Sequence, residues 1–277
     1  MEAAVYQTFV RPKHAGWKTT DWVTWLTEQH IAPSVMANEE GTCALCRAPT
    51  PTDAHGVHYT RCFNCQKQYA SVLDGFVPIC YSVHDGLEGM LWRVKNSPGY
   101  EWLRAPLASL LWHFLERHLS CMERAYGGPF DVFTTVPSHS ETRGGRNHLP
   151  LLLQSVTALN DLWTEGALTK KHSNKAGERR RKISTDLFSA SEDVAGKRIL
   201  LLDDTFTSGG TLASAAYALK QAQASTVVAL AFGRQLHSDW DEHRYLIEQL
   251  PDRSLDLQEC AVHGAGLPWS WISNRHG

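Results

Sequence analysis

Two neighbouring carboxylates, Asp203 and Asp204, are the side chains whose type and position most directly suggest chemistry in this sequence. Four apolar residues at 199–202 precede them and indicate a buried parallel strand, so the acids stand at its carboxyl end. A turn of hydroxyls and glycines follows at 205–211 and leads into a helical pattern from Leu212. Small residues let backbone amides close around a phosphate, and a helix N-terminus adds favourable partial charge.

The two acids would repel a phosphate, so we expect them to bind a different group. Carboxylates suit the vicinal hydroxyls of a sugar, either directly or through a divalent cation. Acids for a diol beside a cradle for a phosphate predict a site for a ribose 5-phosphate. The plainer alternative is an ordinary strand-to-helix turn, which also favours Gly, Ser and Asp.

Four cysteines form two close pairs, Cys43 with Cys46 and Cys62 with Cys65, separated by fifteen residues. Each C-x-x-C turn can direct two thiolates at one ion, and four sulfurs complete a tetrahedron. The intervening residues 47–61 are rich in Pro, Thr and Gly and cannot form a core alone, so a metal would supply the stability. We expect a closed structural zinc site; a redox dithiol pair and an iron–sulfur centre are the alternatives.

The remaining metal-ligating residue types are interpreted conservatively. His55 and His58 lie between the two cysteine pairs, and we interpret them as surface loop residues. Cys80, Cys121 and Cys260 are isolated in the sequence, and we interpret them as small buried apolar groups.

The rest of the chain must supply the elements that position these residues. Strands are expected at 132–136, as the first core strand, and at 167–169, 197–202 and 226–232; helices are expected at 101–124, 149–162, 212–223 and 241–250. A further helix beginning near Thr19 would carry Trp22, Trp25 and Leu26 at helical spacing. This alternation predicts an α/β fold with a parallel sheet and a site at the carboxyl ends of its strands.

Length and composition set the outer bounds. The chain has 277 residues, 43% of them hydrophobic, and a net charge of −2, which argues against a wholesale nucleic-acid coat. No membrane span and no signal peptide are apparent, so we expect a cytoplasmic protein. We divide it into a helical segment at 1–40, a four-cysteine module at 41–70, an α/β core at 78–234 and an extension at 235–277.

The segment from 199 to 212 resembles the signature with which type I phosphoribosyltransferases bind 5-phosphoribosyl-1-pyrophosphate (PRPP). The resemblance implies a type I phosphoribosyltransferase core, with Asp203 and Asp204 on the ribose hydroxyls and magnesium bound with PRPP. It assigns these residues to the 5-phosphate: Thr205, Thr207, Ser208, Gly209, Gly210 and Thr211.

A zinc module ahead of such a core resembles the layout of the ComF family of competence proteins. By the same resemblance, residues 81–100 place Lys95 near the pyrophosphate, and residues 131–147 make Arg143 a pyrophosphate contact, with Arg146 as a further candidate. The acceptor is left unidentified. A different class of function also fits the family: an accessory protein of DNA uptake or repair that binds single-stranded DNA without turnover, with competence or repair proteins as partners.

A basic cluster lies between the expected second and third strands. A run of this kind is most often a solvated loop. In type I phosphoribosyltransferases, however, the corresponding segment is a hood that closes over PRPP. The third interpretation is that the cluster binds a nucleic-acid backbone. The cluster comprises Lys170, Lys171, His172, Lys175, Arg179, Arg180, Arg181 and Lys182.

Overall fold

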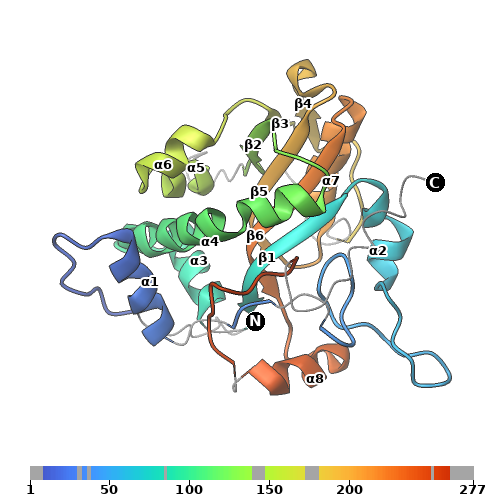
Figure 1. Ribbon diagram of the computed structural model, residues 1–277, viewed down its shortest axis with the longest axis horizontal. Helices are drawn as coiled ribbons and strands as arrows, with labels where there is room; N and C mark the ends of the chain where they lie inside the picture. The colour runs from blue at the N-terminus through green and yellow to red at the C-terminus, as the bar shows by residue number, and fades with distance from the viewer. Residues whose placement is uncertain are drawn as a thin grey trace.

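The computed structural model describes residues 9–29, 33–35, 39–83, 86–138, 147–171, 181–250 and 253–262. Its larger sheet has four parallel strands in the order β1-β6-β5-β2 (Figure 1). Their bounds are β1 Gly75–Ser82, β2 Val132–Thr135, β5 Arg198–Phe206 and β6 Thr226–Gln235. The expected α/β fold with a parallel sheet is therefore confirmed.

Helices cover both faces of this sheet. Successive side chains of the buried strands point to opposite faces and are apolar, so each face needs a covering layer. On β5, Leu200 and Leu202 pack into the apolar core beneath the long helix α4, Arg104–Ala125. Their neighbours Ile199 and Leu201 pack into a second core with α7, Gly210–Gln221, and with the cysteine module. The carboxyl ends of β5 and β6 thus lie beside the module.

The first strand of the sheet is β1, so the expectation that residues 132–136 form the first core strand is wrong. Pro78 lies within β1 and removes a backbone donor, which argues against a strand when the sequence is considered alone. The structure tolerates this proline because β1 is the edge strand of the sheet, paired along its length with β6, and residues 33–35 bond to its outer side at Ile79 and Tyr81 rather than at Pro78.

Two further expectations needed correction. The single helix expected at 149–162 is divided into α5, His148–Leu153, and α6, Thr157–Leu162. The short strand expected at 167–169 is β3, Leu168–Lys170, but it pairs antiparallel with β4, Phe188–Ala190, in a separate sheet. The long helix is confirmed, with a 3₁₀ turn before it and Pro106 in its first turn, where a missing N–H costs little.

The remaining helices surround this core. Trp22, Trp25 and Leu26 of the N-terminal helix are buried, as expected. Among the described residues, no helix is both long and apolar enough to cross a bilayer. The remaining helices are α1 Thr19–Glu28, α2 Phe63–Lys67, α3 Leu87–Asn96 and α8 Asp241–Gln249.

Candidate functional site

The two acids lie inside β5 rather than after it, because the strand extends to Phe206. Successive side chains of a strand point to opposite faces, which separates the environments of Asp203 and Asp204. Residues 207–209 then form the turn, and Gly210 opens α7. The order of strand, acids, turn and helix is as the sequence predicts.

Asp204 is held by two cationic or protonatable side chains from separate helices. Its Oδ2 forms an ion pair with Lys95 of α3 and lies 2.8 Å from His148 Nε2 at the start of α5. The structure therefore brings Lys95 to the acid pair, and its expected contact with pyrophosphate stays a prediction.

His148 was not identified from the sequence. Its ring is buried, and Ser138 Oγ lies 3.5 Å from its Nδ1 while Nε2 faces the carboxylate. A single histidine before a run of leucines does not by itself indicate a functional site. Its position following residues 131–147, which the ComF resemblance singles out, was the one available hint.

The environments of the two acids drive their pKa values apart. Burial and the neighbouring charge of Asp204 raise the pKa of Asp203 to about 8. Burial also opposes ionisation of Asp204, but Lys95 and His148 outweigh it and hold the pKa of that carboxyl below its usual range. At neutral pH Asp204 is thus the ionised member of the pair, and Asp203 is largely protonated.

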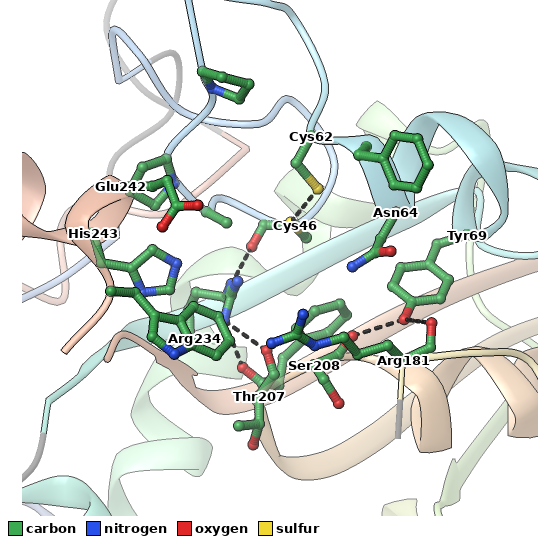
Figure 2. Close-up of a pocket in the computed structure, with 16 residues that line it drawn as sticks. Cys46, Cys62, Asn64, Tyr69, Arg181, Thr207, Ser208, Arg234, Glu242 and His243 are labelled. Carbon is green, nitrogen blue, oxygen red and sulfur yellow. Dashed lines mark hydrogen bonds between the residues drawn. The ribbon is translucent and has the colours of Figure 1, made fainter. Parts of the chain in front are cut away.

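The turn after β5 is fixed from one side by two side chains that sequence reasoning missed (Figure 2). Buried Arg234, at the end of β6, donates through Nη1 to the carbonyls of Phe206 and Thr207, at 2.9 and 3.0 Å. The Tyr69 hydroxyl lies 2.7 Å from the carbonyl of Ser208. An arginine directly after a buried apolar run was the one sequence signal for Arg234.

These contacts orient three successive peptide units. In a trans peptide the N–H points opposite to the C=O. Because the carbonyls of residues 206–208 face Arg234 and Tyr69, the amides of Thr207, Ser208 and Gly209 face the opposite side of the turn. Successive amides at a helix N-terminus make a binding site for an anion such as a phosphate.

Gly209 closes the turn in a left-handed conformation, with φ of 81°. A Cβ at this position would lie 2.3 Å from the Phe206 ring and 2.8 Å from the Tyr69 ring. Both the backbone angle and the close approach therefore require glycine here.

A cavity of about 250 Å³ adjoins the turn on its Arg234 side (Figure 2). Its walls come from the turn, the cysteine module and α8, and Arg181 stacks over the ring of Trp240 at 5.0 Å. Burial and nearby Arg234 lower the pKa of His243 to about 4, so this histidine of the wall is neutral at pH 7. Asp203 and Asp204 are not among the lining residues, so turn and cavity wall separate the acids from this space.

The four paired cysteines converge as the sequence predicts. Their sulfurs lie within 4.8 Å of one another, and Cys46 Sγ is 3.6 Å from Cys62 Sγ. That spacing matches the roughly 3.8 Å between sulfurs in a tetrahedral zinc site with bonds of about 2.3 Å. His55 and His58 are outside the cluster, and His58 Nδ1 instead lies 2.8 Å from the Thr50 carbonyl.

The cysteine module is connected to the turn through Arg234. Its Nε donates to the carbonyl of Cys46 at 2.7 Å, while Nη1 reaches the carbonyls of the turn. One buried guanidinium thus binds the backbone of both sites. Reorganising either end would leave buried carbonyls without their donor.

Several predicted residues are not placed at the acids. Arg143, Arg146 and residues 172–180 of the basic cluster lie outside the described residues. Of the described part, Lys170 lies over the Phe188 ring and is near enough to Asp203 for its charge to oppose the rise in the pKa of that acid, whereas Arg181 belongs to the cavity wall. Cys80, Cys121 and Cys260 are all buried, as expected, and Cys121 and Cys260 also lie together beside His118.

Comparison with known proteins identifies part of this architecture. Residues 121–255 match the family model described as phosphoribosyl transferase domain, a stretch just under half of the chain. No curated protein matches the chain significantly. The matched stretch contains β2, β5, the turn and β6, whereas β1, Lys95 and the cysteine module precede it. The chain therefore combines a phosphoribosyltransferase-type domain with a four-cysteine cluster, and the match supports a phosphoribosyltransferase-like function.

Proposed function

We propose that the chain binds PRPP at the carboxyl end of β5 and transfers its ribose 5-phosphate to an acceptor. The observation that best supports this proposal is the geometry of the turn after β5. Arg234 and Tyr69 hold the carbonyls of residues 206–208, so the amides of residues 207–209 face away from these two side chains. Those amides and the N-terminus of α7 would bind the 5-phosphate. The hydroxyls of Thr205, Thr207, Ser208 and Thr211 add further donors beside the glycines Gly209 and Gly210.

The acid pair would receive the ribose. Asp203 is the better placed of the two for the sugar hydroxyls, because Oδ2 of Asp204 already contacts Lys95 and His148. Asp204 then holds Lys95, whose ammonium would pair with a pyrophosphate oxygen. Arg143 would contribute a second cation to the pyrophosphate.

The chemistry follows from this placement. The C1–O bond to pyrophosphate breaks, its electron pair leaves with the pyrophosphate, and a nitrogen nucleophile of the acceptor forms the new bond at C1. The ionised carboxylate of Asp204 beside the ring would stabilise the oxocarbenium-like transition state, while the largely protonated Asp203 would hold the ribose hydroxyls by hydrogen bonds. Most of the rate effect would come from positioning and electrostatics. Magnesium, when bound with PRPP, would supply charge neutralisation on the pyrophosphate, and its preferred ligands are carboxylate oxygens, which Asp203 offers once it loses its proton.

The finer assignment we propose is a ComF-type protein. Its support is the order of a four-cysteine module followed by β1, α3 with Lys95 and the phosphoribosyltransferase-type domain. In this proposal Cys43, Cys46, Cys62 and Cys65 hold a structural zinc. A zinc ion bound there would keep the Cys46 backbone in place, and Arg234, which donates to the Cys46 carbonyl, would in turn hold the turn.

The proposal is tested by calorimetric titration of PRPP with magnesium into the wild type and into the Asp203→Asn/Asp204→Asn double variant. We expect binding by the wild type and its loss in the double variant. Asp241→Asn is the matched control, since that exposed carboxylate on α8 lies away from the acids. Equal binding by the double variant and the wild type would refute the site.

A second function is favoured by one surface of the module. The side chains of Val57, Tyr59 and Phe63 are exposed, and Lys67 lies 5.2 Å from the centre of the Phe63 ring. Exposed aromatic rings beside a cation suit the stacking of single-stranded DNA bases. We propose this binding as the alternative role, which would serve DNA uptake or repair with partner proteins of those processes.

Fluorescence anisotropy with a labelled oligonucleotide tests the alternative. Binding should weaken steeply as salt is raised, and Phe63→Ala should weaken it further because a stacking platform is lost. Val10→Ala, at an exposed apolar residue ahead of α1, is the control. Absence of binding, or binding indifferent to salt, would exclude this role.

A further inference from the structure

Three buried side chains of the metal-ligating types meet far from the four-cysteine cluster. His118 and Cys121 lie one turn apart on α4, and Cys260 comes from the segment after α8. One ligand atom of each lies within 4.8 Å of the others. All three residues are at most 8% exposed. The sequence separation of Cys260 explains why this group was not anticipated.

The hydrogen bonding of His118 settles which of its nitrogens faces the sulfurs. Nε2 lies 2.9 Å from the carbonyl of Leu257, and a carbonyl can only accept, so Nε2 carries the proton. Nδ1 then carries the lone pair, and it lies 3.9 Å from Cys121 Sγ. A histidine whose second nitrogen donates to a backbone carbonyl is the usual arrangement of a metal-ligating histidine.

The spacing and the charge also suit a metal ion. A tetrahedral ion with Zn–S near 2.3 Å and Zn–N near 2.0 Å separates sulfur and nitrogen by about 3.5 Å, and the observed distance of 3.9 Å is within a small side-chain movement of this value. Two thiolates and a neutral imidazole balance the two positive charges of zinc, which makes the site compatible with burial. Arg124 Nη2 donates to Cys121 Sγ at 3.6 Å, so this sulfur already serves as an acceptor.

We propose that His118, Cys121 and Cys260 bind a second Zn²⁺, with a water molecule or another small ligand in the fourth position. The ion would attach the C-terminal segment to α4. The same segment also contacts the cysteine module, since Arg47 Nη2 donates to the Ala261 carbonyl at 2.6 Å. The second ion would therefore connect the longest helix, the C-terminal segment and the first zinc module.

The decisive measurement is the zinc content of the full-length protein after removal of loosely bound metal by a weak chelator. We expect about two zinc ions per chain in the wild type. Cys260→Ala and His118→Ala should each retain about one. Cys80→Ala is the matched control, a buried cysteine outside both groups, and should retain both ions.

Further variants and one chemical measurement separate the alternatives. Cys260→His should keep the second ion, because imidazole can replace thiolate as a zinc ligand. A wild type with one zinc ion overturns the proposal, and this result needs no variant to fold. A disulfide between Cys121 and Cys260, detected as a mass difference on reduction of the alkylated wild type, would overturn it as well.

Discussion

The carboxylate of Asp203 is a destabilising group in the folded protein. Its pKa of about 8 lies above the value near 3.9 expected in the unfolded chain, so the folded state binds more protons between pH 4 and 8. The contribution of Asp203 to stability is therefore most favourable below this window and is lost as the pH rises through it. Asp203→Asn removes the effect, and its advantage over the wild type should grow from pH 4 to pH 8.

This prediction is measured as the free energy of unfolding in urea, for both proteins, at a series of pH values. Asp193→Asn provides the comparison, because that acid is exposed on a 3₁₀ turn. A difference between Asp203→Asn and the wild type that stays constant with pH would contradict the predicted effect.

Asp204 should behave in the opposite way. Its folded pKa is lowered, so it stabilises the fold above pH 4 and loses this contribution as the pH falls. Asp204→Asn leaves Lys95 and His148 without their counter-ion and should cost on the order of 3 kcal/mol at pH 7. Asp241→Asn, which breaks an exposed pair with Arg244, should cost less than about 1 kcal/mol. Equal losses in the two variants, measured by urea unfolding, would contradict the role of Asp204.

Gly209 allows a variant that separates backbone strain from steric contact. Gly209→Ala should destabilise the protein by about 1–3 kcal/mol for the left-handed angle, with a further loss from the Phe206 and Tyr69 rings. Gly196→Ala has a similar φ of 71° and open space around its Cβ, so it measures the angle alone. Thermal unfolding of both variants tests this, and similar losses would mean that the rings move aside freely.

At the scale of elements, β6 contributes Arg234 to two backbones at once. Arg234→Met would leave the carbonyls of Cys46, Phe206 and Thr207 without this donor. Each buried carbonyl that loses its hydrogen bond lowers the free energy of unfolding by about 1–3 kcal/mol. We expect a marked fall in stability and, because the turn loses its orientation, weaker PRPP binding. Arg244→Met, at an exposed position of α8, should cost less than about 1 kcal/mol and leave PRPP binding unchanged. PRPP titration and urea unfolding check both effects, and wild-type affinity in folded Arg234→Met would refute the orienting role.

The layering of elements also explains why Lys95 and His148 reach the same carboxylate. Helices α3 and α5 lie on the α4 side of the sheet, and Asp204 continues the face of β5 that carries Leu200 and Leu202. A residue one position earlier or later on β5 would face the α7 side instead. The register of a single strand thus decides which acid acquires the positive partners.

At the scale of the whole molecule, the four-cysteine module contacts the turn after β5 through Arg234, and we propose that zinc bound in the module supports this turn. Removing zinc with a strong chelator should loosen Cys46, release Arg234 and weaken PRPP binding at least several-fold, with recovery when zinc is restored. Titration of PRPP into the stripped and the reloaded protein measures this. Unchanged affinity in the stripped protein would show that the turn keeps its shape without the metal.

The sequence alone determined the features that are local in the chain. The acids followed by a glycine-rich turn, the two C-x-x-C pairs and the alternation of apolar strands with helices are each encoded within a short segment. Because backbone geometry follows from near neighbours, such signals predicted the α/β fold, the strand-to-helix turn and the four-cysteine cluster.

The tertiary structure decided which distant residues meet. The pairing of Lys95 and His148 with Asp204, the bridge made by Arg234, and the group of His118, Cys121 and Cys260 all join separate elements. The place of β1 at the sheet edge is another such outcome, since its proline is acceptable there and not in the centre. These contacts depend on how the layers of the fold pack together, so the spacing of residues within a single segment cannot predict them.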